Sequence, residues 1–196
     1  MNSTARASHH TGDGDRADIV HLRGPAARVR QALAAHFLAG VPTIVEIGGY
    51  LNPISDHLVH DADKVVVVDP KITPFEGVLR GGACAVSHIR AKYQAIDLSK
   101  LPRPYALVML GYSMKGLGGR PAVDPALLDL LDGAQRVIIE WATDLERATS
   151  QVPSLLSRPA LRQVCRIDFT LEDGVIDASP YASRTLVVLE RRQTAS

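Results

Sequence analysis

The sequence has few of the features that mark several protein classes. Its 196 residues include two cysteines, Cys84 and Cys165, and only 5% are aromatic. Neither a CxxC pair nor the Cys/His spacing of a zinc site is present, so we expect two reduced thiols and no bound metal. No apolar run approaches the length needed to span a bilayer. We therefore expect a cytoplasmic protein with no membrane partner.

The charges of the two signs nearly cancel. The formal net charge is +1, which gives no broad positive field to gather nucleic acid. The arginines are scattered and form no long basic stripe. A small molecule is therefore the expected partner, and nucleic acid is not.

The N-terminus is small, polar and without an apolar core. We expect residues 1–18, "MNSTARASHHTGDGDRAD", to be a disordered leader and 19–196 to form a single domain. The chain length suits one domain with a sizeable core.

Strands alternate with helices through the middle of the chain. The clearest strand is "KVVVVDP" (64–70), because four consecutive valines are typical of a strand buried on both faces. Periodicity and capping residues predict further strands over 43–48, 92–98, 105–111 and 136–142, and helices over 25–39, 55–62, 124–134 and part of 144–159, where Pro153 bends or divides the helix. A helix or irregular segment is expected over 73–88.

Two strand-like runs close the chain, "RQVCRIDFTLEDG" and "SRTLVVLERR". They have no helical pattern between them and predict an antiparallel pair. The fold class is thus α/β: a doubly wound, mostly parallel seven-stranded sheet with an antiparallel C-terminal strand pair. The link "SKLPRP" is too short for a crossover helix. Either the strands on its two sides lie on opposite sides of the first strand, or one boundary is wrong.

Four motifs in order resemble the class I S-adenosylmethionine-dependent methyltransferases, over about residues 25–192. They are "VEIGGY" in a strand and glycine loop, "VVVVDP" with an acid after the second strand, "YQAIDLSKLP", and the paired tail ending "SRTLVVLERR". In open α/β sheets, ligands bind outside the carboxyl ends of the strands.

The resemblance implies S-adenosylmethionine as cofactor and a role for each matching residue. Glu46 would orient the loop or contact the methionine part, Asp69 would accept the ribose hydroxyls, and Asp97 would meet the adenine amine. The other cofactor-binding residues that it implies are Gly48, Gly49, Tyr50, Leu98 and Gly111. The loop departs from the family pattern at Tyr50 and Asn52, where glycines are usual, so the Tyr50 ring must either cover the cofactor or point away.

Acceptor residues are expected on the loop after the fourth strand. Tyr112, Ser113 and Lys115 would position a substrate or transfer a proton, or else they are solvated residues of a Gly-rich loop. Glu140 is either a substrate contact or a charge at a helix start, and Trp141 is either a pocket wall or, as we prefer, a core residue.

The sequence thus predicts methyl transfer from S-adenosylmethionine to a small-molecule acceptor, plausible in specialised metabolism. Part of the acceptor pocket would come from the N-terminal segment, from loops, or from a second subunit in a homodimer. The main alternative is a non-catalytic protein of the same fold that binds a ligand or stabilises a partner. A nicotinamide-dependent oxidoreductase is a weaker one, because "GGYLNP" lacks the later glycines of a dinucleotide loop.

Overall fold

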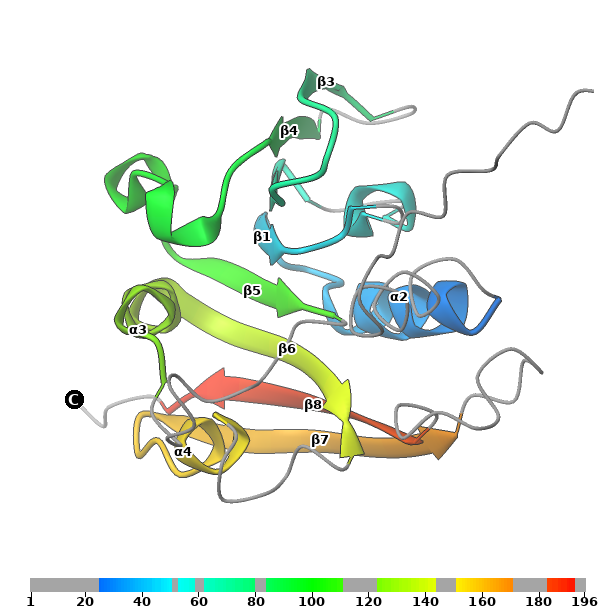
Figure 1. The fold of residues 1–196 in the computed structure, drawn as a ribbon, viewed down its shortest axis with the longest axis vertical. Helices are drawn as coiled ribbons and strands as arrows, with labels where there is room; N and C mark the ends of the chain where they lie inside the picture. Colours follow the sequence, from blue (N-terminus) through cyan, green and yellow to red (C-terminus); the bar gives the residue numbers. More distant parts are fainter. Residues whose placement is uncertain are drawn as a thin grey trace, which may run out of the picture.

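An eight-stranded sheet forms the centre of the described part of the molecule (Figure 1). The computed structural model describes residues 25–50, 53–58, 62–79, 84–110, 123–143, 151–170 and 183–192. The strand order is β3-β4-β2-β1-β5-β6-β8-β7. The strands are β1 (Thr43–Ile47), β2 (Lys64–Val68), β3 (Phe75–Val78), β4 (Ala85–Ile89), β5 (Tyr105–Met109), β6 (Ala134–Ala142), β7 (Leu161–Thr170) and β8 (Ser183–Arg191).

The five strands at the middle of the order, β4, β2, β1, β5 and β6, run parallel. The chain builds outward from β1 first through β2 and β4, and then reverses to add β5 and β6 on the other side. The point where the order reverses lies between β1 and β5, and in doubly wound sheets this is where ligands bind. The strands β3, β8 and β7 extend the sheet by antiparallel pairing.

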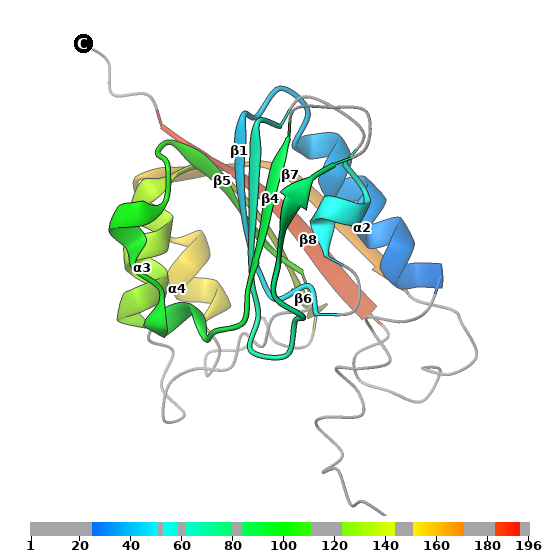
Figure 2. The same cartoon turned by 90° about the horizontal axis from the view of Figure 1, so that it is seen from above.

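Both faces of the sheet are covered, and Figure 2 shows the two layers from above. One face carries α3 (Pro125–Gly133), α4 (Val152–Leu156) and the 3₁₀ turns η2 (Tyr93–Ala95) and η3 (Leu98–Lys100). The other carries α2 (Pro25–Phe37) and the 3₁₀ turn η1 (Ile54–Asp56). The valines of β2 alternate between the two apolar clusters, with Val66 in one and Val65 and Val67 in the other. The predicted burial of this strand on both faces is confirmed.

The start of α3 follows from its sequence. Asp124 precedes the helix and its carboxylate accepts a hydrogen bond from the backbone N–H of Ala126, at 3.0 Å, while Pro125 has no N–H that would need an acceptor in the first turn. At the other end, Arg191 donates to the carbonyl oxygens of Leu131 and Asp132, which satisfies acceptors that the helix leaves open.

Two predictions about the middle of the chain are wrong. The segment 73–88 contributes the antiparallel strands β3 and β4, and 92–98 is no strand, so the sheet gains two strands, loses one and has eight instead of the predicted seven. The Tyr93 hydroxyl donates to the Asp124 carboxylate at 2.6 Å, and the amide of Gln94 donates to the same oxygen. These bonds hold the segment across the sheet face as η2 and η3, where it cannot pair with a strand edge.

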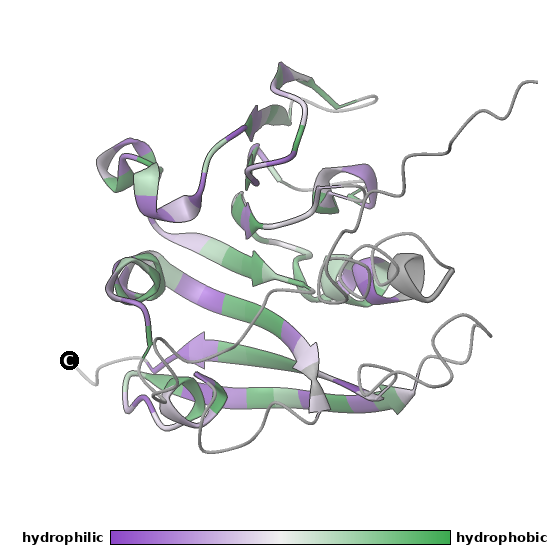
Figure 3. Ribbon diagram, viewed as in Figure 1, coloured by the Kyte–Doolittle hydropathy of each residue, from purple (hydrophilic) through white to green (hydrophobic). Residues whose placement is uncertain are grey.

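The remaining elements agree with the prediction in type. The closing strands pair antiparallel, and β7 alternates hydrophilic and hydrophobic residues along the edge of the sheet (Figure 3). The predicted helix over 55–62 is reduced to η1 among its described residues, and Pro153 stands in the first turn of α4. In the described part of the chain, no helix has both the length and the apolar character that a membrane span requires.

A buried ion cluster joins α2 to the sheet. Glu140 on β6 is fully buried and accepts hydrogen bonds from Arg30 of α2, at 2.8 Å, and from Arg184 of β8. Burial lowers the pKa of Arg30, and the Glu140 carboxylate opposes that shift. The cluster fixes the helix against the half of the sheet that includes β6 and β8.

Neutralising Glu140 tests this role. Glu140→Gln leaves two buried guanidinium groups facing one another, so we expect a loss of about 3–5 kcal/mol of unfolding free energy. The matched control is Glu190→Gln on β8, which removes a half-buried pair with Arg136 and an exposed one with Arg162, and should cost at most about 1 kcal/mol. Urea denaturation measures both, and equal losses would contradict a special role for the buried cluster.

Candidate functional site at the carboxyl edge of the sheet

The glycine turn and Asp69 meet at the carboxyl ends of β1 and β2. These strands are parallel neighbours, and Ile47 pairs with Val68 in their register. The backbone N–H of Gly48 donates to the carbonyl oxygen of Val68 at 3.0 Å, directly before Asp69. Two sequence motifs separated by the whole β1–β2 connection are therefore side by side.

The turn requires glycine at both positions. Gly48 and Gly49 have φ values of 97° and 91°, in the region that side chains disfavour. A Cβ on Gly49 would lie 2.6 Å from Oε2 of Glu46, so the turn folds closely over that carboxyl group. Tyr50 follows the turn and is half-buried. Asn52 lies outside the described residues.

Glu46 is a buried carboxyl group beneath the glycine turn. It is fully buried, and its Oε2 accepts a hydrogen bond from the backbone N–H of Ile54 at 2.7 Å. Its Oε1 has no hydrogen-bond partner in the described part of the chain. Burial raises the pKa of this carboxyl to about 8; the Ile54 and Gln31 contacts lower it, and the charges of Asp56 and Asp69 raise it further.

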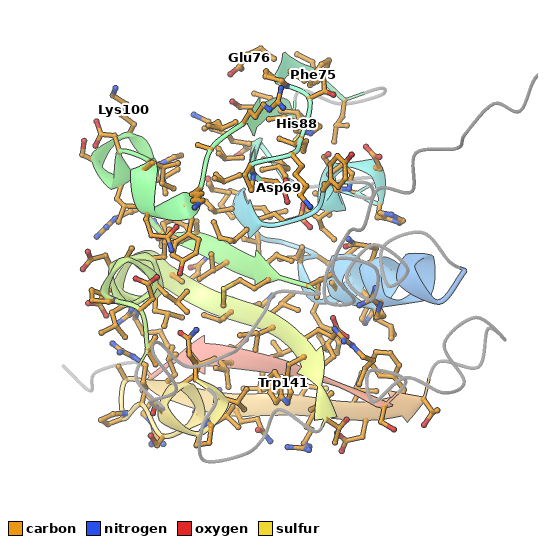
Figure 4. The ribbon with its side chains drawn as sticks, viewed as in Figure 1. Asp69, Phe75, Glu76, His88, Lys100 and Trp141 are labelled. Carbon is orange, nitrogen blue, oxygen red and sulfur yellow. The ribbon has the colours of Figure 1, made fainter. Side chains whose placement is uncertain are left out.

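Asp69 holds one carboxylate oxygen fixed and leaves the other available. It is 8% exposed, and Oδ1 accepts a hydrogen bond from the backbone N–H of Lys71 at 2.6 Å. Within the described residues, Oδ2 receives none. Figure 4 shows Asp69 in the upper part of the molecule, below His88 and Phe75 in that view. The side chain can accept hydrogen bonds from a ligand at this edge.

Asp97 does not follow a strand, contrary to the expectation. It precedes η3, where its Oδ1 accepts hydrogen bonds from the backbone N–H and the hydroxyl of Ser99, and these bonds lower the pKa of its carboxyl. Its side chain is 52% exposed. Leu98, the other residue expected beside adenine, packs against the apolar core under η3.

Asp97 does line a cavity of about 550 Å³ between β4 and the segment of η2 and η3. Lys100 from η3 and Glu76 from β3, both labelled in Figure 4, come from its two sides. The apolar residues that line it are Val66, Ala85, Val86, Ile89, Ala91, Ala95, Ile96 and Leu101, and of these Ile89 stands at the carboxyl end of β4. The carbonyl oxygen of Ile89 also accepts a hydrogen bond from the backbone N–H of Asp69, at 3.1 Å, so the cavity begins one strand away from that acid.

A further contact behind the turn was not anticipated from the sequence. The hydroxyl of Ser55 and Nε2 of His88 lie 3.2 Å apart, which joins η1 to β4. Burial lowers the pKa of His88, while Asp56 and Glu76 raise it. Predicting this contact would have required recognising residues 85–89 as a strand beside β2, and the sequence pattern of that segment does not indicate a strand.

The residues expected to handle the acceptor lie outside the described structure. These are Gly111, Tyr112, Ser113 and Lys115. Of the two residues considered on the fifth predicted strand, Glu140 belongs to the buried ion cluster, and Trp141 is fully buried in the apolar core with Val152 and Leu155, as preferred. The described residues contain no group of His, Cys, Asp and Glu side chains that could hold a metal ion.

Comparison with known proteins gives a consistent fold at low sequence identity. No protein-family model and no curated protein sequence matches the chain. Among solved structures, the N-methyltransferase NodS from Bradyrhizobium japonicum WM9 has a TM-score of 0.59 at 14% identity, with 88% of this chain and 99% of that one covered.

Two further similar structures differ in the acceptor that their names state. The O-methyltransferase TomG from Streptomyces achromogenes, in complex with SAM, has a TM-score of 0.50 at 15% identity over 91% of this chain and 89% of that one. The small RNA methyltransferase HEN1 has a TM-score of 0.53 at 13% identity over 99% of this chain and 27% of that one. At these identities, the likeness concerns the fold alone.

The closeness of the glycine turn to Glu46 can be tested with two substitutions. Gly40→Ala places a side chain at φ 74° with no atom within 4 Å, and should cost about 1–2 kcal/mol of unfolding free energy. Gly49→Ala adds a collision with a buried carboxyl that is held by Ile54, so its loss should be larger by at least about 1 kcal/mol. Equal losses in urea denaturation would contradict the close packing.

The raised pKa of Glu46 predicts how stability depends on pH. Unfolded Glu46 ionises near its ordinary value of 4.5, whereas the folded protein keeps the proton up to about pH 8. Between these values unfolding releases a proton, so stability falls as pH rises, by at most about 1.4 kcal/mol per pH unit. Glu46→Gln cannot ionise and should lose this decline. Parallel stability profiles of the two proteins from pH 5 to pH 8 would contradict the assignment.

Proposed function

We propose that this chain, which has the fold of the class I S-adenosylmethionine-dependent methyltransferases, binds S-adenosylmethionine at the carboxyl edge of β1, β2 and β4 and transfers its methyl group to a small molecule. One observation carries the proposal: the hydrogen bond from Gly48 to Val68 joins the left-handed glycine turn to the acid that ends β2. A backbone turn without side chains beside a carboxylate is suited to a ligand with a nucleoside.

The residues present fit the parts of this cofactor. The ribose hydroxyls would donate to the free oxygen of Asp69, and the methionine part would lie over Gly48 and Gly49, where no Cβ obstructs it. The unpartnered Oε1 of Glu46, directly beneath the turn, adds a negative or neutral acceptor on the side where the amino and sulfonium charges would lie.

We place the adenine at the mouth of the cavity beside β4. Ile89 lines the cavity there, and its carbonyl oxygen accepts a hydrogen bond from the backbone N–H of Asp69. Asp97, which also lines the cavity, would offer carboxylate oxygens to the exocyclic amine. This position keeps the role that the resemblance gave to Asp97, and replaces Leu98 by Ile89 and Ile96 as the apolar contacts. A pocket with apolar walls and a few polar groups is typical of cofactor sites.

The cofactor supplies a methyl group already activated on a sulfonium. The protein then needs mainly to hold donor and acceptor in line and to exclude water. A small-molecule acceptor is favoured by the charge of the chain, because a net charge of +1 does not attract a polyanion. The segment with Tyr112, Ser113 and Lys115 is our proposal for the acceptor side.

Substituting Asp69 tests the cofactor site. Asp69→Ala removes the ribose acceptor, so calorimetric titration with S-adenosylmethionine should show binding weaker by about 1–3 kcal/mol, with little loss of stability. Asp63→Ala is the matched control, because this exposed acid precedes the opposite end of β2.

The same titration distinguishes the other outcomes. Unchanged affinity in Asp69→Ala would remove Asp69 from the site, and no binding of S-adenosylmethionine or S-adenosylhomocysteine by the unmodified protein at millimolar concentration would refute the proposal. Binding without S-adenosylhomocysteine production from any small-molecule pool would support the non-catalytic alternative.

A further inference from the structure

The Glu46 carboxyl is placed where an ionised group would be costly. Its side chain has no exposed surface, Oε2 accepts a hydrogen bond from the backbone N–H of Ile54, and the Gln31 amide contacts the carboxyl. The other oxygen, Oε1, has no partner in the described part of the protein. A buried carboxylate without a cation or several hydrogen bonds is disfavoured relative to its neutral acid.

The groups that face Glu46 do not supply a cation. From α2 comes the neutral amide of Gln31, and from η1 come the Ile54 N–H and the Asp56 carboxylate. Asp69 faces it from the end of β2 with a second negative charge. Arg30, next to Gln31 on α2, is bonded to Glu140 on β6. Both charges that reach Glu46 therefore favour its protonated form.

We propose that Glu46 carries a proton in the free protein at neutral pH and that S-adenosylmethionine, on binding over the glycine turn, releases this proton to solvent. The inference rests on the proposed cofactor site. The glycine turn is packed directly onto the Glu46 carboxyl, so a positive charge bound there stabilises the carboxylate. The proton passes from Glu46 to the buffer, and no covalent bond to the ligand forms.

Proton release gives the site two properties. Affinity for S-adenosylmethionine rises with pH, by about tenfold per pH unit while a full proton is released, and levels off above the pKa of about 8 that the free protein has. S-adenosylhomocysteine lacks the sulfonium charge and releases less of the proton. The preference for methyl donor over its product therefore increases as pH rises toward 8.

Calorimetry in buffers of different ionisation enthalpy counts the protons. At pH 7, in phosphate and in Tris, the unmodified protein should release close to one proton per S-adenosylmethionine bound, and close to none at pH 9.5. Glu46→Gln should bind without release at either pH. Asp63→Asn, an exposed acid at the far end of β2, should behave as the unmodified protein does.

The outcomes separate the inference from the cofactor proposal. If the unmodified protein binds S-adenosylmethionine at pH 7 with the same observed enthalpy in both buffers, the proposed proton release is overturned and the cofactor site stands. No binding at all refutes the proposed function, and this inference with it.

A second measurement needs no variant. A ¹³C-carboxyl NMR titration of the free protein should find Glu46 protonated at pH 7, and ionised after addition of S-adenosylmethionine. An ionised Glu46 in the free protein at pH 7 overturns the inference even if Glu46→Gln does not fold.

Discussion

The close packing of the glycine turn on a buried carboxyl determines the shape of the carboxyl edge. Glu46 is the penultimate residue of β1 and has no exposed surface. After the glycine turn the chain passes over its side chain, so that the backbone N–H of Ile54 donates to Oε2. Because a Cβ on Gly49 would overlap that carboxyl, only glycine lets the chain turn there. The same turn brings Gly48 to β2, and thereby places Asp69 beside it. The geometry of the site thus depends on the buried side chain of Glu46 and on the lack of a side chain at Gly49.

Among the described residues, the half of the sheet that contains β1, β2, β3 and β4 is connected without long helices. The described residues between β1 and β2 form only η1, those between β2 and β4 include β3, and those between β4 and β5 form η2 and η3. The 3₁₀ segment spans the face more loosely than a packed helix would, and a cavity of about 550 Å³ lies beneath it. On the other half, α2, α3 and α4 pack against β5, β6 and β8, and the Glu140 ion cluster holds α2 in place. The described residues thus leave one cavity beside β4 and a second, of about 540 Å³, at the amino edge of the sheet, where Gly40, Arg136 and Arg191 line it.

Much of this arrangement could be predicted from the sequence, for identifiable reasons. The valines of β2, the capped helix after Asp124 and the closing strand pair each carry a strong local pattern, and all three are confirmed. The segment 92–98 was predicted as a strand because its local composition suits one. The tertiary bond from Tyr93 to Asp124 decides otherwise, and no local pattern reveals it. The β3–β4 hairpin was missed because a short, exposed edge strand such as Phe75–Val78 has little apolar periodicity.

The residues of the site also divide into those that a local sequence pattern reveals and those that depend on tertiary contacts. Glu46, Gly48 and Asp69 were singled out because acids and glycines after apolar strands are recognisable in sequence, and the structure brings them together. The full burial of Glu46 and the shift of Asp97 to a turn depend on packing between distant segments, so they needed coordinates. The acceptor residues Tyr112, Ser113 and Lys115 stay a prediction.

The most direct test of a cofactor site at this edge is a map of backbone amide shifts on titration with S-adenosylhomocysteine. The account predicts that the largest changes fall on Gly48, Gly49, Asp69 and the residues from Ile89 to Asp97. Changes concentrated instead around Gly40, Arg136 and Arg191, at the opposite edge of the sheet, would contradict it.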